Sequence, residues 1–379
     1  MNAASSSVEI DPAVDARFMA LALTLGRRGL GNTWPNPAVG AVIVRHEANG
    51  PVVVARGWTQ PGGRPHAEVE ALARAGEAAR GATIYTTLEP CSHFGKSPPC
   101  ADAIIAAGIA RVVSAMADPN PEIAGEGYRR LKAKGIAVVT GVGADEARRA
   151  HAGHVSRMRD GRPHVLLKLA VSADGKAGLA GRRPAVITGE AARDRVHLLR
   201  AMHDGILVGI GTVLADDPEL TCRLPGMISR SPVRIVLDRA LRLPPECRLV
   251  RGARTIPVWV VTCHTAPSDR AKRLRELGVE VIGVEAVDRS RDLGPVLKRL
   301  GGAGLTRLMV EGGPTVARAF VAADLVDEAA LFRGPNAIGP DGIDALTGMP
   351  LTHLTHAPYL RPRGGETLGP DRLELFERA

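Results

Sequence analysis

Aromatic residues are scarce in this chain and make up only 3% of its 379 residues. A surface that binds single-stranded nucleic acid by stacking bases needs aromatic side chains, so the composition counts against such a protein. No apolar run approaches the roughly 20 residues that span a bilayer. The N-terminal segment carries no basic stretch typical of a secretory signal. We therefore expect a cytoplasmic protein without a membrane partner.

Cysteine is also rare, with five residues in the whole chain. An odd number in a cytosolic protein argues against a disulfide framework and for metal binding or buried thiols. Only Cys91 and Cys100 lie close together in the sequence. We interpret the other three, Cys222, Cys247 and Cys263, as buried thiols.

The charge balance favours an anionic ligand. Lys and Arg total 49 against 40 Asp and Glu, so the formal net charge is +9, and it is spread along the chain. Nucleic acid and a small phosphate ester both fit this charge. The hydrophobic content of 45% is ordinary for a globular protein, and the length suits about two domains.

Strand and helix patterns alternate through both halves, which predicts two α/β layered domains with mostly parallel strands. A polar, Arg-rich stretch at 146–162 is interpreted as a linker between domains at 11–145 and 163–379. In the first half we expect helices at 11–28, 67–79, 100–107 and 125–134, and strands at 38–44, 52–55, 82–88, 110–116 and 136–140. In the second half we expect helices at 191–202, 269–277, 293–300 and 315–323, a loop at 212–223, and strands at 165–170, 206–208, 233–237, 257–262, 279–284, 307–310, 329–332 and 372–376.

One His and two Cys in the first half have the pattern of a catalytic zinc site. His66 opens a predicted helix, Cys91 follows a predicted strand, and Cys100 begins another helix. Three protein ligands leave a fourth position open for water, whose pKa the metal lowers to near neutrality. Glu68, two residues beyond His66, can exchange protons with that water without binding the metal.

Two other interpretations fit the same residues. The His and Cys residues can be unrelated solvent-exposed and core side chains, but their order and their places at helix starts argue against this. A structural zinc site needs a fourth ligand, for which His93 is the nearest candidate. We interpret His93 as a substrate-side residue and Lys96 as a phosphate contact. The H-x-E and P-C…C order is typical of zinc nucleobase deaminases.

The first half contains five motifs that belong together: Pro35-Asn36-Pro37-Ala38-Val39-Gly40, His66-Ala67-Glu68-Val69-Glu70-Ala71, Thr87-Leu88-Glu89-Pro90-Cys91-Ser92-His93, Pro98-Pro99-Cys100 and Asp118-Pro119-Asn120-Pro121. With these motifs the chain resembles one family, the bifunctional deaminase–reductases of riboflavin biosynthesis, over about residues 13–376. It implies a cytidine-deaminase-like first domain that removes the 2-amino group of 2,5-diamino-6-ribosylamino-4(3H)-pyrimidinone 5′-phosphate. It also implies a substrate contact at Asn36.

In the second half, a Gly-rich turn is the most informative motif. Glu311-Gly312-Gly313-Pro314-Thr315 lies between a predicted strand and a predicted helix. Glycine there lets the backbone approach a phosphate, which the helix N-terminus then favours. The motif is not G-x-G-x-x-G, so it does not indicate a Rossmann domain.

Together with segments 167–176 and 212–223, this turn resembles the reductase domain of the same family. The resemblance implies a dihydrofolate-reductase-like α/β fold, NADPH as cofactor, reduction of the ribosyl group to ribityl, and a homodimer or larger homo-oligomer. The implied cofactor contacts are Ala170, Thr212, Asp216, Gly312, Gly313, Pro314, Thr315, Val316 and Ala317. The implied substrate contacts are Arg200, Leu220, Arg223 and Glu311, and we add Lys168 as a polar group near the reacting carbon.

The chain departs from the family at two reductase positions. Pro184 stands where the family usually has Ser, and Val186 where it usually has Trp. Proline removes a hydroxyl and a backbone donor, so we carry neither role over and expect reduction to be weaker or differently arranged.

The sequence leaves two alternative functions open. One is a zinc deaminase that acts on a nucleic-acid base, which the net charge suits but the aromatic scarcity and the second domain do not. The other is a working deaminase joined to a reductase-like domain that only binds ligand, which Pro184 and Val186 favour.

Overall fold

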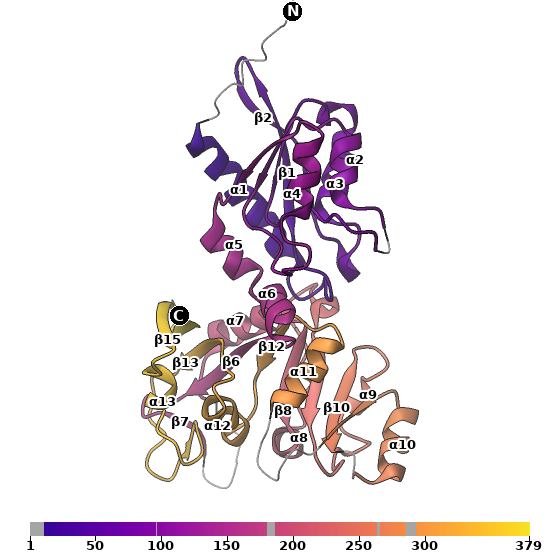
Figure 1. The fold of residues 1–379 in the computed structure, drawn as a ribbon. Helices are drawn as coiled ribbons and strands as arrows, with labels where there is room; N and C mark the ends of the chain where they lie inside the picture. The colour runs from indigo at the N-terminus through magenta and orange to yellow at the C-terminus, as the bar shows by residue number, and fades with distance from the viewer. Residues whose placement is uncertain (1–10, 96, 180–185, 264–265, 286–292) are drawn as a thin grey trace, which may run out of the picture. The chain divides into compact units, whose positions relative to one another are not determined.

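The computed structural model describes residues 11–95, 97–179, 186–263, 266–285 and 293–379, and it divides the chain into two compact units (Figure 1). Unit 1 is Met1–Asp160 and unit 2 is Gly161–Ala379. The stretch expected as a linker is largely helical, because α5 (Ala144–Ala150) and α6 (Ala152–Asp160) occupy most of it. Both helices lie within unit 1.

Unit 1 is built on a five-stranded sheet in the order β2-β1-β3-β4-β5. The last three strands are parallel, whereas β1 runs antiparallel to both of its neighbours. The expectation of mostly parallel strands is therefore wrong for β1 and β2, which a two-residue turn joins into a hairpin. The strands are β1 (Gly40–Glu47), β2 (Gly50–Trp58), β3 (Thr83–Thr86), β4 (Arg111–Ser114) and β5 (Ala137–Thr140).

Helices cover both faces of this sheet, and the alternation of side chains along β1 explains why (Figure 1). Ala41 and Ile43 pack into one hydrophobic cluster, and Val42 and Val44 into another. The first cluster includes side chains of α2 (Ala67–Ala75), α3 (Cys100–Ala106) and α4 (Glu126–Ala133), and the second those of α1 (Pro12–Gly26) and α5. All four expected helices of this half are confirmed, and unit 1 is a three-layer α/β/α unit.

Unit 2 is built on a nine-stranded sheet in the order β11-β10-β9-β8-β12-β6-β13-β16-β15. The first seven strands are parallel and the last two antiparallel. All eight expected strands are confirmed. They are β6 (His164–Val171), β8 (Gly205–Gly209), β9 (Val233–Leu237), β10 (Val258–Cys263), β11 (Glu280–Val284), β12 (Arg307–Val310), β13 (Glu328–Arg333) and β16 (Asp371–Arg378).

The sequence did not predict β15 (Leu360–Leu368), because most of its residues are exposed and polar and leave no alternating apolar pattern. It also did not predict the short strands β7 (Lys176–Gly178) and β14 (Ile343–Asp344), which pair with each other. These strands are too short to show a period.

The four expected helices of unit 2 are confirmed, and one expected loop is corrected. The segment expected as a loop from Thr212 begins inside helix α8 (Ile210–Asp216), which buries Ile210 and Val213. The next residue, Asp217, has a left-handed backbone conformation that caps the helix. The helices are α7 (Glu190–Ala201), α10 (Ser268–Glu276), α11 (Gly294–Gly302) and α12 (Pro314–Ala322), with the shorter α9 (Arg248–Arg251) and α13 (Thr352–Thr355).

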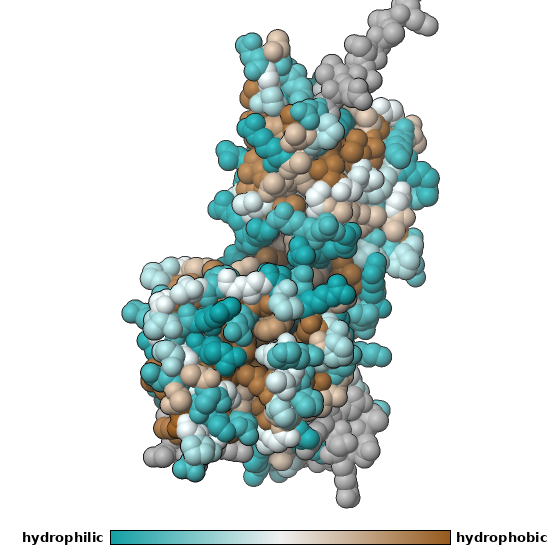
Figure 2. Space-filling view, turned by 90° about the vertical axis from the view of Figure 1, so that its left-hand side faces the viewer, coloured by the Kyte–Doolittle hydropathy of each residue, from teal (hydrophilic) through white to brown (hydrophobic). Residues whose placement is uncertain are grey.

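Large apolar side chains that remain exposed are dispersed over both units. Phe94 belongs to unit 1, and Val186, Leu214 and Ile228 belong to unit 2. Hydrophilic residues and smaller apolar areas are interspersed on the face drawn in Figure 2. Within the described ranges, no helix combines the length and apolar character needed to cross a bilayer.

A buried polar group lies at the amino ends of β8 and β12. The carboxylate of Asp204 accepts hydrogen bonds from the backbone N–H and hydroxyl of Thr306 and from the backbone N–H of Arg307. Next to it, His203 is only 3% exposed, and its Nδ1 lies 2.7 Å from the carbonyl oxygen of Leu199. Burial, aided by the charge of Arg307, lowers the pKa of His203 to about 4.

This lowered pKa predicts acid sensitivity of unit 2. Between pH 6.5 and pH 4 the unfolded chain binds a proton at His203 and the folded chain does not, so stability falls as the pH falls. The loss from this residue is about 2 kcal/mol between pH 7 and pH 5. Scanning calorimetry at the two pH values should show a smaller pH-dependent loss for His203→Gln than for the parent protein. The exposed His353→Gln serves as control, and equal losses in all three proteins would contradict the assignment.

Candidate functional sites at the carboxyl edges of the two sheets

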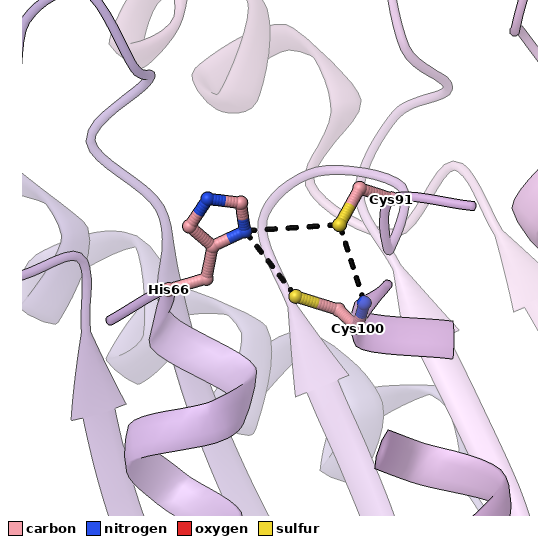
Figure 3. Close-up of side chains that lie close together, drawn as sticks. All are labelled: His66, Cys91 and Cys100. Carbon is pink, nitrogen blue, oxygen red and sulfur yellow. Dashed lines mark hydrogen bonds between the residues drawn. The ribbon is translucent and has the colours of Figure 1, made fainter. Parts of the chain in front are cut away.

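In unit 1, three side chains from separate elements converge (Figure 3). His66 is the N-cap of α2, Cys91 follows β3, and Cys100 is the first residue of α3. The Nδ1 atom of His66 lies 3.3 Å from Sγ of Cys100 and 3.7 Å from Sγ of Cys91. The backbone N–H of Cys100 donates to Sγ of Cys91 over 3.2 Å.

These distances fit a tetrahedral zinc ion. With Zn–S bonds of about 2.3 Å and Zn–N bonds of about 2.0–2.1 Å, tetrahedral geometry separates a ligand nitrogen from a ligand sulfur by about 3.5 Å. The donor set of two thiols and an imidazole is also the one that zinc prefers. Among the described residues, this is the one group of His, Cys, Asp and Glu side chains close enough to hold a metal ion.

The electrostatics of this cluster favour an anionic sulfur. The thiol of Cys100 hydrogen-bonds to the sulfur of Cys91, so the pKa of Cys91 falls to about 4 while that of Cys100 rises. His66 and the backbone N–H of Cys100 add to the lowering at Cys91. A thiolate is the form that binds a metal.

Glu68 lies in the first turn of α2 and is only 3% exposed. Burial raises the pKa of its carboxyl to about 6, although the charge of His66 acts in the opposite direction. A carboxyl group with such a pKa can both accept and release a proton near neutral pH. The start of α2 therefore presents a candidate metal ligand and a candidate proton carrier within one turn.

Glu89 has a role that the sequence did not reveal, although it stands inside a quoted motif. Its carboxylate accepts hydrogen bonds from the backbone N–H groups of Asp118, Gly125 and Gly127, at 2.9–3.1 Å. At Gly127 an added Cβ would lie 2.2 Å from the carbonyl oxygen of Pro90. Glu89 therefore fixes the loop after β4 against the segment that carries Cys91.

The structure describes two of the three remaining predicted residues of unit 1. Asn36 is half-buried and donates from Nδ2 to the carbonyl oxygen of Gly63. His93 is exposed, and Lys96 lies outside the described residues. Elsewhere, Cys222 and Cys247 are buried and Cys263 is half-buried, and all three are free thiols.

In unit 2, a half-buried carboxylate pairs with two cations at the end of β12. Glu311 follows this strand directly, and its carboxylate lies 3.2 Å from Nζ of Lys168 in β6 and 3.0 Å from Nη2 of Arg200 in α7. Arg200 also donates from Nη1 to the carbonyl oxygen of Thr221. Burial opposes ionisation of Glu311, but the charges of Lys168 and Arg200 outweigh it and lower the pKa to about 2.

The predicted glycine turn packs closely against its neighbours. Gly312 and Gly313 connect β12 to α12, and a Cβ added to Gly312 would lie 2.7 Å from Cβ of Val316. A Cβ added to Gly313 would lie 3.4 Å from Oγ1 of Thr212, which belongs to α8. The turn and the start of α8 therefore lie side by side at the carboxyl edge of β8 and β12.

The other predicted residues of unit 2 belong to segments at the same edge or near it. Ala170 is half-buried near the end of β6, Leu220 is buried, and Asp216 and Arg223 are exposed. Within the α12 segment, Ala317 is buried, Pro314 and Val316 are half-buried, and Thr315 is exposed. Of the two family departures, Val186 is 87% exposed and Pro184 lies outside the described residues.

Two known families match the chain in these regions. Residues 12–116 match the cytidine and deoxycytidylate deaminase zinc-binding region, which includes His66, Glu68, Cys91 and Cys100. Residues 163–372 match the RibD C-terminal domain, which includes Lys168, Arg200 and the Gly312–Gly313 turn.

Relatives with both regions match almost the whole chain. The riboflavin biosynthesis protein RibD of Escherichia coli is 41% identical over 369 residues, which cover 94% of this chain and 97% of the relative. A structure of Acinetobacter baumannii RibD superposes with a TM-score of 0.86 at 33% identity and covers 97% of this chain and all of that one. The deaminase/reductase structure of Thermotoga maritima has a TM-score of 0.82 at 32% identity, covering 97% and 99% of the two chains. The chain therefore belongs to the RibD family of bifunctional riboflavin biosynthesis enzymes, with a zinc-dependent deaminase region in unit 1 and a reductase region in unit 2.

Proposed function

We propose that unit 1 hydrolyses the 2-amino group of 2,5-diamino-6-ribosylamino-4(3H)-pyrimidinone 5′-phosphate and that unit 2 reduces the ribosyl group of the product to ribityl with NADPH. The observation that carries the proposal is the convergence of His66, Cys91 and Cys100 beside a buried Glu68 in a member of this family. We further propose a cytoplasmic homo-oligomer without a nucleic-acid or membrane partner.

In unit 1, His66, Cys91 and Cys100 would hold zinc. Zinc, when bound, lowers the pKa of a water molecule and so supplies the nucleophile for hydrolysis. Glu68 accepts a proton from the attacking water and delivers it to a ring nitrogen of the pyrimidine. It then takes the second proton from the new hydroxyl group on the attacked carbon and passes it to the amino group, which leaves as ammonia while the carbonyl forms. The burial of Glu68 supports this role, because its carboxyl exchanges protons without competition from bulk water.

The loops around this centre give the ring its orientation. The half-buried Asn36 and the exposed His93 are proposed substrate contacts on two of these loops. Lys96 is proposed as a contact for the phosphate of the substrate.

In unit 2, the carboxyl edge of β6, β8 and β12 would bind both NADPH and the substrate. The nicotinamide supplies the hydride. The backbone of Gly312–Gly313 and the N-terminus of α12 suit a phosphate of the cofactor, and Ala170, Thr212 and Asp216 are proposed to lie along it, together with Pro314, Thr315, Val316 and Ala317.

The charged group around Glu311 would orient the sugar. Because its pKa is held at about 2, Glu311 stays ionised and fixes the side chains of Lys168 and Arg200. Lys168 is then available as a donor near the reacting carbon, while Arg200, Arg223 and Leu220 line the substrate. A guanidinium group binds phosphate through paired hydrogen bonds.

Both half-reactions are expected in one tube. With zinc-loaded protein, the diaminopyrimidinone ribosyl phosphate and NADPH, ammonia release should precede the loss of nicotinamide absorbance, because deamination makes the substrate for reduction. Ammonia without NADPH loss would mean that Pro184 and Val186 mark a domain that binds but does not reduce. The absence of both signals would refute the proposed function, and binding of tRNA that weakens steeply with salt would then favour the nucleic-acid alternative.

Replacing Glu68 by Gln should abolish ammonia release and leave zinc in place. The amide keeps the shape of the side chain but cannot carry a proton, and general acid–base catalysis contributes about 10²–10⁴-fold. Zinc content by metal analysis and ammonia release together check this prediction. The matched control is Glu70→Gln, on the same helix and paired with Arg74. A Glu68→Gln protein that still releases ammonia would remove Glu68 from the mechanism.

Replacing Arg223 by Ala should raise the KM of the reduction about tenfold and leave deamination unchanged. Arg223 is exposed, and its nearest acidic partner is Glu219 at 3.6 Å, so its guanidinium is accessible to an anionic ligand. A lost charged hydrogen bond costs about 1.5–3 kcal/mol. The two rates are measured separately, with the exposed Arg273→Ala as control. Equal losses of deamination and reduction would contradict the assignment of Arg223 to substrate binding in the reduction alone.

A further inference from the structure

Arg64 connects the two sides of the candidate zinc site. It lies two residues before His66, and its Nη1 donates a hydrogen bond to Oγ of Ser97, three residues before Cys100. Its Nη2 lies against Gly95, where an added Cβ would be 3.5 Å away. The guanidinium is therefore held on the segment between Cys91 and Cys100.

Arg64 differs from the second arginine that contacts this segment. Arg130 donates from Nη1 to the carbonyl oxygen of Ser92 over 3.0 Å, and its Nε lies 2.8 Å from the carboxylate of Asp102. Its charge is therefore neutralised. Among the described residues, no carboxylate pairs with Arg64, and its hydrogen-bond partner is a neutral hydroxyl.

The position of this unneutralised charge matters for a phosphorylated substrate. The pyrimidine ring must reach the metal centre for its amino group to be attacked, and the 5′-phosphate lies several bonds away on the ribose. A group that binds the phosphate must therefore lie at the rim of the site. Arg64 and Ser97 lie there, half-buried and exposed respectively, and a guanidinium beside a hydroxyl offers several donors to phosphate oxygens.

We propose that Arg64, together with the hydroxyl of Ser97, binds the 5′-phosphate of the deaminase substrate and makes unit 1 selective for the phosphorylated compound. This inference rests on the proposed function of unit 1. It assigns a specificity-determining residue that precedes the zinc-ligand motif.

The test compares the phosphorylated substrate with its dephosphorylated riboside. Arg64→Ala should raise the KM for ammonia release from the phosphate ester tenfold or more and leave the KM for the riboside unchanged. Arg64→Lys should recover part of the loss, because Lys keeps the charge but not the planar fork. Arg80→Ala, which removes an exposed arginine of unit 1 paired with Glu77, is the charge-matched control.

A second measurement does not depend on turnover of the riboside. Ribose 5-phosphate should inhibit ammonia release from the parent protein, with an inhibition constant about tenfold higher in Arg64→Ala. Unchanged zinc content and unchanged reductase activity would show that the variant is folded.

The outcomes separate this inference from the proposed function. If Arg64→Ala keeps the preference for the phosphate ester and the inhibition by ribose 5-phosphate, the inference is wrong and the deaminase assignment stands. Equal losses with both substrates would also overturn it, because they would show a structural role. If the parent protein releases no ammonia from either compound, the proposed function itself fails.

Discussion

The parallel pairing of strands is the constraint on which both sites depend, because parallel strands end at the same edge of a sheet. In unit 1, β3 and β4 are parallel, so the segment that carries Cys91 and the loop that begins near Asp118 leave from one edge. The carboxylate of Glu89 then ties these segments together through three backbone N–H groups. In unit 2, parallel β6, β12 and β8 bring Lys168, Glu311 and the start of α8 to a common edge.

The carboxylates of Glu68 and Glu311 show how surroundings give the same chemical group opposite properties. At Glu68 burial outweighs the charge of His66 and raises the pKa to about 6, whereas at Glu311 the charges of Lys168 and Arg200 outweigh burial and lower the pKa to about 2. Glu68 can therefore exchange a proton near neutral pH. Glu311 remains a fixed anion, which suits the orientation of two cationic side chains rather than proton transfer.

The arginines of the two sites differ in whether an acidic side chain neutralises them. Arg130 is neutralised by Asp102 and Arg200 by Glu311. Arg64 is paired with a hydroxyl, and Arg223 only loosely with Glu219. A positive charge left in each unit suits a small phosphorylated pyrimidine substrate.

The sequence by itself determined the family, the α/β class of both units, most of their strands and helices, and the grouping of His66 with Cys91 and Cys100. These features depend on local periodicity and on motifs that stay contiguous in the chain. Tertiary structure decided the antiparallel β1–β2 pairing and the helix at Ile210–Asp216. It also decided the exposed β15 strand, which shows no apolar alternation. The contacts of Glu89 and Arg64 also came from tertiary structure, because their partners lie about 30 residues or more away and no local pattern marks such a contact.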